Sequence, residues 1–129
     1  MSEDAVIVAA VRTPIGRFGG AFSELPATTL GAIAVRAILE RSAIDPVRID
    51  DVLIGQVLQA GAGQNPARQS ALGGGIPHSV PAMTVNQVCG GGQRAPHLGA
   101  QAIRARRRPG FDDPRAASAA AQSSRLQDG

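Results

Sequence analysis

The stretch AMTVNQVCGGGQRAPHLGAQAIRA, residues 82–105, contains an apolar run, a cysteine, three glycines and then residues at helical spacing. This order predicts a strand over 82–88, Cys89 at its end, and a helix over about 90–105. Sites in open α/β sheets lie at the carboxyl ends of strands, and a helix N-terminus stabilises a nearby thiolate. The glycines allow a substrate to approach the backbone, whose N–H groups can hold an oxyanion. Cys89 is therefore the candidate nucleophile for acyl transfer.

Two other interpretations of the same loop stay open. A lone cysteine is often a small buried hydrophobe, which would leave Cys89 without a chemical role. Gly90, Gly92 and Ala95 also fit a loose dinucleotide-binding fingerprint, G-x-G-x-x-G/A. That fingerprint requires an acid at the end of the next strand, but the acids at residues 112–113 follow no predicted strand. We therefore favour the nucleophile over a nucleotide site.

Two further apolar runs predict strands elsewhere in the chain. Residues 5–11, AVIVAAV, are continuously apolar, as expected for a strand that is buried on both faces of a parallel sheet. Residues 51–58, DVLIGQVL, predict a second such strand. Strand and helix therefore alternate three times along the chain. This alternation is typical of an α/β fold, here with a three-stranded, mostly parallel sheet and helices packed against it.

Helices are predicted between these strands. Apolar residues recur at helical spacing over 29–42, and Thr28 or Thr29 is the expected N-cap. Asn65 is the expected N-cap of a short helix over 66–72, whose first residue is a proline. Both predictions depend on local signals alone.

Residues 106–129 differ in composition from the rest of the chain. They contain an arginine run at 106–108, five alanines, three serines and no apolar period. This composition predicts disorder or at most a weak alanine-rich helix. We therefore divide the chain into a folded domain, 1–105, and a tail, 106–129. The arginine run could bind phosphate or nucleic acid, but a solvated run is the simpler interpretation.

Composition and charge exclude several classes of protein. The net charge is +3, and residues 1–105 hold eight arginines against seven acids, so the predicted domain has no basic footprint for nucleic acid. No stretch approaches the ~20 apolar residues of a membrane span. One cysteine excludes a disulfide framework and a cysteine-rich zinc site, and no metal-ligand spacing is present. His78 and His97 are expected to be surface residues. The acidic N-terminus argues against a leader peptide and favours a cytoplasmic protein.

Separated segments resemble the thiolase family, which includes acetyl-CoA acetyltransferases and 3-ketoacyl-CoA thiolases. VNQVCGGG at 85–92 resembles the acyl-enzyme cysteine segment of that family. AVIVAAVRTPIGRFGGAF at 5–22 is similar to its first strand and loop, and IDDVLIGQVLQAGAGQNPARQSAL at 49–72 is similar to its second strand and helix. HLGAQAIRA at 97–105 resembles the end of the helix behind the cysteine. These segments occur in the order found in the family.

The resemblance implies a two-step acyl transfer through a cysteine acyl-enzyme. Cys89 matches the nucleophile, and its backbone N–H is expected to help hold the acyl oxygen. Asn86 and Gln64 match family positions near the site or the subunit interface, and Gly90 and Gly92 are supporting residues of the loop. The resemblance further implies acetyl-CoA or another acyl-CoA as substrate, no additional cofactor, and association into dimers or tetramers.

The chain also departs from the family pattern. The second half of the family chain supplies a catalytic histidine and a second cysteine, and the resemblance stops abruptly after Ala105, which predicts a shift of reading frame there. Gly91 stands where the family usually has serine, and Gln93 replaces an apolar residue. Pro96 lies inside the predicted helix, where proline costs ~3 kcal/mol. We therefore expect a truncated thiolase N-terminal domain that is inactive alone. The alternative is a non-catalytic remnant that is unstable or associates with intact thiolase subunits.

Overall fold

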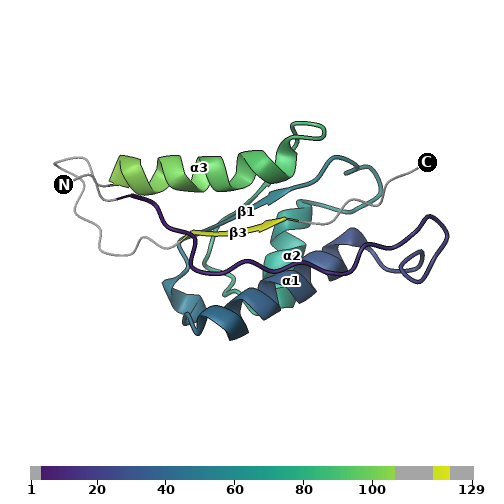
Figure 1. Cartoon of the computed structure of the whole chain (residues 1–129), viewed down its shortest axis with the longest axis horizontal. Coiled ribbons are helices and arrows are strands. Elements are labelled where there is room, and N and C mark those ends of the chain that lie inside the picture. Colours follow the sequence, from purple (N-terminus) through teal and green to yellow (C-terminus); the bar gives the residue numbers. More distant parts are fainter. Residues whose placement is uncertain (1–3, 107–117, 123–129) are drawn as a thin grey trace.

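Helices cover both faces of a small parallel sheet in this chain (Figure 1). The computed structural model describes residues 4–106 and 118–122. The elements in chain order are α1 (Ala27–Ser42), a 3-10 turn η1 (Pro46–Arg48), β1 (Asp51–Gly55), α2 (Pro66–Gly74), β2 (Ala82–Val85), α3 (Gly91–Arg106) and β3 (Ser118–Gln122). Helix α3 lies on one side of the sheet, and α1 and α2 lie on the other. The predicted α/β architecture is confirmed.

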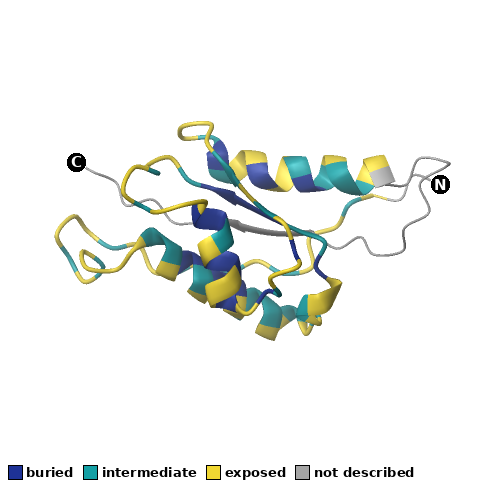
Figure 2. Cartoon of the chain, turned by 180° about the vertical axis from the view of Figure 1, so that it is seen from behind, coloured by how far each residue is buried: buried dark blue, intermediate teal, exposed yellow. Residues whose placement is uncertain are grey.

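Strand β1 is the centre of the sheet, whose order is β2–β1–β3. Both of its neighbours run parallel to it, with Val52 paired to Ala82 on one side and to Ala119 on the other. Val52 and Ile54 are each 1% exposed on one face of β1, and Leu53 is 2% exposed on the opposite face, so both faces of this strand are buried (Figure 2). A strand buried on both faces explains the continuous apolar run in its sequence.

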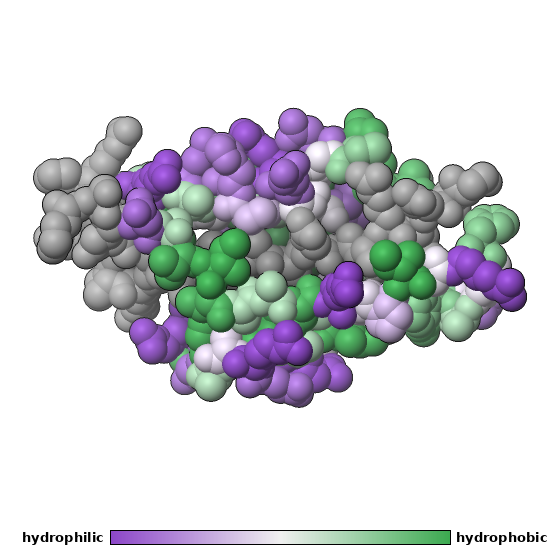
Figure 3. Space-filling view, viewed as in Figure 1, coloured by the Kyte–Doolittle hydropathy of each residue, from purple (hydrophilic) through white to green (hydrophobic). Residues whose placement is uncertain are grey.

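The strand predicted at 5–11 is not present. This segment is extended but unpaired with the sheet, and Ile7 is 85% exposed. Both edges of β1 are taken, one by β2 and the other by β3, so no position beside β1 is left for it. Arg41 of α1 instead holds the segment from outside, through a 2.9 Å hydrogen bond from Nη1 to the carbonyl of Ala10. Apolar surface consequently follows the path of the N-terminal segment (Figure 3).

The tail contributes a strand where disorder was predicted. Ser118–Gln122 forms β3 and pairs with Asp51–Gly55 along the whole length of β1. The expectation of disorder is therefore wrong for these five residues. Residues 107–117 and 123–129, including most of the arginine run, lie outside the described residues, so the expectation stays a prediction there.

The helix boundaries agree with the sequence in one case and differ in another. Asn65 is the N-cap of α2 as predicted, and its side chain accepts a hydrogen bond from the backbone N–H of Arg68. Helix α1 begins two residues earlier than predicted, after Pro26, and no side chain caps it. Neither Thr28 nor Thr29 is the cap, because both lie inside the first turn. Proline precedes this helix because its fixed φ suits the entry into a helix.

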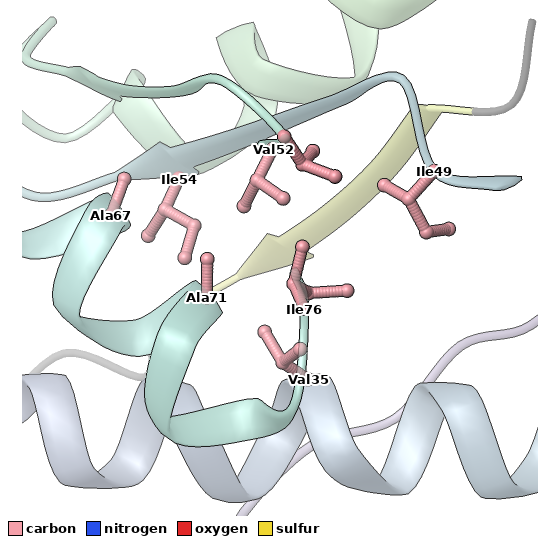
Figure 4. Packing of buried hydrophobic residues seen from close by; sticks show 8 residues of the cluster. Val35, Ile49, Val52, Ile54, Ala67, Ala71 and Ile76 are labelled. Atoms are coloured by element: carbon pink, nitrogen blue, oxygen red, sulfur yellow. The ribbon is translucent and has the colours of Figure 1, made fainter. Parts of the chain in front are cut away.

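The core lies between β1 and the pair α1–α2 (Figure 4). Aliphatic side chains from each element fill it: Val35 from α1, Val52 and Ile54 from β1, Ala67 and Ala71 from α2. The two alanines are completely buried, so α2 packs closely against its neighbours. The small side chains therefore replace the aromatic residues that this chain lacks in its core.

Glycine allows α1 and α2 to touch. A Cβ at Gly31 would lie 2.4 Å from Oγ of Ser70, which no ordinary contact permits. In this close approach Ser70 donates a 3.2 Å hydrogen bond to the carbonyl of Thr28. Arg36 of α1 also donates from Nη2 to the carbonyl of Gly73, at 2.8 Å. The two helices are thus joined by polar contacts as well as by packing.

Polar side chains of α2 fix the position of β2. Asn65 donates from Nδ2 to the carbonyl of Ala82 at 2.9 Å, and its Oδ1 accepts from the hydroxyl of Thr84 at 2.8 Å. Arg68 donates from its two terminal nitrogens to the carbonyls of His78 and Val80 in the loop between α2 and β2. These bonds attach β2, and the loop that precedes it, to the start of α2.

Candidate active site

Cys89 lies in the turn between β2 and α3, at the carboxyl end of the sheet. Strand β2 ends at Val85, earlier than the predicted residue 88, and α3 begins two residues after the cysteine. The backbone N–H of Gly90 donates to the carbonyl of Gln87 at 2.9 Å, and this bond closes the turn. Cys89 is exposed and lies two residues before the first residue of α3.

Val88, immediately before the cysteine, has a strained backbone. Its φ is 45°, in the left-handed region, although it is a β-branched residue for which this conformation is a genuine outlier. Such a conformation costs of order 1–3 kcal/mol and persists only where the surroundings over-determine it. The Oδ1 of Asn86 accepts a 3.0 Å hydrogen bond from the N–H of Val88, and the N–H of Gly91 donates to its carbonyl at 3.2 Å.

The ends of β1 and α3 approach closely beneath this turn. A Cβ at Gly55, the last residue of β1, would lie 2.3 Å from backbone atoms of both Gly91 and Gly92. Only glycine therefore fits at position 55. A Cβ at Gly91, where the sequence departs from the family serine, would lie 3.0 Å from the carbonyl oxygen of Val85. The start of α3 is thus seated directly on the strand ends.

Cys89 and Gly92 line an open hollow of about 1200 Å³. Its walls come from three further segments: residues 23–28, the end of β1 with 56–58, and the loop 60–63. Small-molecule sites typically enclose about 300–1,000 Å³, so this hollow is large enough for an extended ligand. Four of its lining residues are glycines, so that much of the wall is main chain.

Polar side chains also face this hollow. Glu24, Gln56, Gln69 and Gln93 all line it, and the sequence points only to Gln93, as a replacement of an apolar residue. Gln56 could have been found, because it immediately follows a strand and so lies at the carboxyl edge of a parallel sheet. Glu24 carries no local signal of this kind, since only the folding of the loop before α1 brings it to the site.

The supporting residues predicted from the resemblance lie around the turn to different extents. Gly92 shares the wall of the hollow with Cys89, and Gly90 follows the cysteine and closes its turn. Asn86 acts through its amide, which binds backbone on both sides of the hollow. Gln64 lies in the neighbouring loop before α2, where its carbonyl accepts a 2.9 Å hydrogen bond from Gln69.

Neither histidine of the chain is placed against the cysteine. His97 is exposed on α3, and its Nε2 lies 3.2 Å from Nε2 of Gln101 in a side-chain hydrogen bond. His78 is exposed in the loop before β2. Among the residues lining the hollow there is no histidine, so the described chain supplies no imidazole base to the thiol.

The described residues contain neither a metal-binding cluster nor a helix that could span a membrane. No group of three or more His, Cys, Asp or Glu side chains within residues 4–106 and 118–122 could hold a metal ion. In the same part of the chain, no helix has the length and apolar character required to span a bilayer.

The described chain is a parallel α/β unit with an exposed cysteine at a strand-to-helix junction, in the wall of an open hollow. Residues 5–111 match the family described as "Thiolase, N-terminal domain". The chain belongs to the thiolase family. This match ends six residues beyond the boundary of 105 expected from the sequence.

Individual relatives support this assignment. The chain is 56% identical over 102 residues to an acetyl-CoA acetyltransferase of Pseudomonas aeruginosa. The aligned segment covers 79% of this chain and 26% of that relative. The chain is 55% identical over 103 residues to an acetyl-CoA acetyltransferase of Thiocystis violacea, covering 80% and 26%. A probable acetyl-CoA acetyltransferase of Escherichia coli is 55% identical over 101 residues, covering 78% and 26%. The chain therefore spans about a quarter of the length of the curated relatives it matches.

Proposed function

We propose that Cys89 is the acyl acceptor of a thiolase-type acyltransferase that acts on acetyl-CoA or another acyl-CoA. The observation that carries this proposal is the position of the exposed thiol beside the start of α3, in the wall of a hollow of about 1200 Å³. The relatives named acetyl-CoA acetyltransferase support the choice of substrate class.

The proposed first step transfers an acyl group from one sulfur to another. The thiolate of Cys89 attacks the carbonyl carbon of the acyl-CoA, and the bond from that carbon to the coenzyme A sulfur breaks. Coenzyme A leaves as its thiolate and takes up a proton, while Cys89 retains the acyl group as a thioester. No metal or further cofactor takes part in this step.

We propose further that the 129 residues by themselves stop at this acyl-enzyme. Condensation requires a base that removes a proton from the second substrate. The two histidines of this chain lie outside the hollow, and the family resemblance attributes that role to a part of the protein absent from this sequence. The alternative is a non-catalytic remnant that associates with intact thiolase subunits.

Two expectations from the sequence remain part of the proposal. We propose a cytoplasmic location, where a single cysteine stays reduced. The division into a domain, 1–105, and a tail, 106–129, also stays a proposal, and β3 from the tail pairs with β1 across that boundary.

Intact-mass measurement after incubation with acetyl-CoA tests the proposal. The chain is expected to gain the mass of one acetyl group, and Cys89→Ala is expected to abolish the gain, since this is the sole cysteine. An adduct that survives in Cys89→Ala would remove the cysteine as acceptor. Complete turnover of acetoacetyl-CoA by the pure chain would contradict the view that it stops at the acyl-enzyme. An unmodified chain that gains no acetyl group would contradict the proposal and favour the remnant.

A further inference from the structure

The side-chain amide of Asn86 connects two segments that flank Cys89. Its Oδ1 accepts from the N–H of Val88 at 3.0 Å, and its Nδ2 donates to the carbonyl of Val57 at 3.2 Å. Val57 and Val88 both line the hollow, whereas Asn86 does not. The amide of Asn86 therefore bridges the segment after β1 to the turn that contains Cys89.

The hydrogen bond between Asn86 and Val88 involves the residue whose backbone is strained. A valine in the left-handed region readily relaxes to an extended or helical conformation unless its neighbours prevent it. Asn86 satisfies the N–H of Val88 in the observed conformation, as asparagine commonly does two residues ahead in a turn. Relaxation of Val88 would rotate the next residue, which is Cys89.

The bond to Val57 fixes where the turn lies. Strand β1 and the start of α3 already touch at Gly55, and the N–H of Gln56 donates to the carbonyl of Val85 at 3.0 Å. Within the turn, the N–H of Gly90 donates to Gln87 and the N–H of Gly91 donates to Val88. The bond between Asn86 and Val57 adds a side-chain contact from this turn to the segment after β1.

We infer that Asn86 is a positioning residue, which holds Val88 in its strained conformation and so directs the sulfur of Cys89 into the hollow. This role deepens the proposed function and rests on it only in taking Cys89 as the acyl acceptor. Asn86 itself touches no substrate. It acts through the backbone of the residue before the nucleophile.

The matched control is Asn65, the other asparagine that bridges two elements. The backbone of Asn65 is itself left-handed, with φ of 43°, and its amide joins the start of α2 to β2. Asn65 is distant in sequence from the cysteine turn, and its amide forms hydrogen bonds with Ala82 and Thr84. Asn65→Ala therefore removes a comparable pair of hydrogen bonds and leaves the bond between Asn86 and Val88 intact.

The test compares two reagents on the single cysteine. Iodoacetamide is small and reacts with any accessible thiolate, so its rate is measured against pH up to the plateau where every thiol is ionised. Acetyl-CoA must enter the hollow, and its acylation rate is measured by intact mass. The variants are Asn86→Ala, Asn65→Ala and the double variant Asn86→Ala with Val88→Gly, in which glycine adopts the left-handed conformation freely.

We expect Asn86→Ala to lower the acylation rate about tenfold, since misplacing a reacting atom slows a reaction that depends on orientation. Its iodoacetamide plateau is expected to rise by about threefold, because the released thiol turns towards solvent. Asn65→Ala should leave both rates in the folded protein unchanged. The double variant should recover most of the acylation rate.

Other results would overturn the inference. The inference fails if Asn86→Ala reacts at the same rates as the unmodified chain with both reagents. It also fails if Asn65→Ala changes both rates as much as Asn86→Ala does, because the amide of Asn86 would then have only a structural role. If the unmodified chain is not acetylated at all, the proposed function fails. In that case the positioning role is tested by the plateau rates with iodoacetamide alone. Equal plateau rates in Asn86→Ala and Asn65→Ala would contradict it.

Discussion

Replacing Gly55 with alanine tests whether β1 and α3 fix the cysteine turn between them. The added Cβ would lie 2.3 Å from the carbonyl carbon of Gly91 and from the nitrogen of Gly92, whereas ordinary contact begins at 3.4 Å. The first turn of α3 must therefore retreat by roughly 1 Å, because the obstacle is helix backbone and no rotamer change relieves it. Overpacking of this kind costs about 1–3 kcal/mol, and we expect a loss near the upper value.

Urea unfolding followed by far-ultraviolet circular dichroism measures this loss, because the chain has no Trp or Tyr for fluorescence. The plateau rate of Cys89 with iodoacetamide is measured in parallel and is expected to change in Gly55→Ala. The control is Gly75→Ala at the C-cap of α2, where φ is 98° but nothing lies within 4 Å of the added Cβ. That variant should lose about 1–2 kcal/mol through backbone strain alone and keep its cysteine reactivity. A loss below about 1 kcal/mol in Gly55→Ala would refute the close approach.

Three further substitutions test other parts of the fold by the same unfolding assay. Gly31→Ala places a Cβ 2.4 Å from Oγ of Ser70 and should cost about 1–3 kcal/mol, and adding Ser70→Gly should recover more than half; additive losses would contradict the contact. Pro96→Ala should stabilise the chain by about 1–3 kcal/mol, since it restores a helical N–H inside α3, and an unchanged midpoint would count against this reasoning. Ile7→Ser should change the free energy of unfolding by less than about 0.5 kcal/mol because Ile7 is 85% exposed, whereas a loss above about 1.5 kcal/mol would show that the segment is buried.

The sequence predicts those features of the fold that depend on local chemistry. Asn65 followed by proline marks the start of α2, since one side chain and one fixed φ are sufficient to begin a helix. The two strands beside α2 are also predicted, at β1 and β2, although each ends before the predicted residue. Local signals give the presence of an element more reliably than its last residue.

The position of a strand in the sheet depends on competition that the sequence does not express. The apolar run 5–11 indicates a segment that favours burial, but it does not indicate which edge is free. In the structure, Ser118–Gln122 occupies that edge of β1, although alanine and glutamine have little preference for strands. The composition of residues 106–129 therefore predicts disorder for a segment that pairs with the sheet.

The candidate site likewise combines a feature that the local sequence predicts with contacts that it does not predict. Cys89 is predicted because a strand, a cysteine, glycines and a helix follow one another directly in the sequence. The amide of Asn86 reaches a carbonyl 29 residues away, and Gly55 touches Gly91 across a comparable distance in the chain. No local pattern reports such contacts, which exist only after the strands have paired.

The walls of the hollow determine how readily its selectivity could change. Glycines at 55, 61, 63 and 92 leave much of its surface to main-chain atoms, which no substitution of a neighbouring side chain removes. The shape of the hollow should therefore tolerate variation elsewhere in the chain, and relatives with different loops could keep the same cavity. Bulk added at Gly61 would meet open space but would strain the backbone, because φ there is 75°. The larger side chains of the wall, among them Leu25, Val57 and Leu58, can be shortened without that strain, so single substitutions should widen this hollow more readily than they narrow it at a glycine.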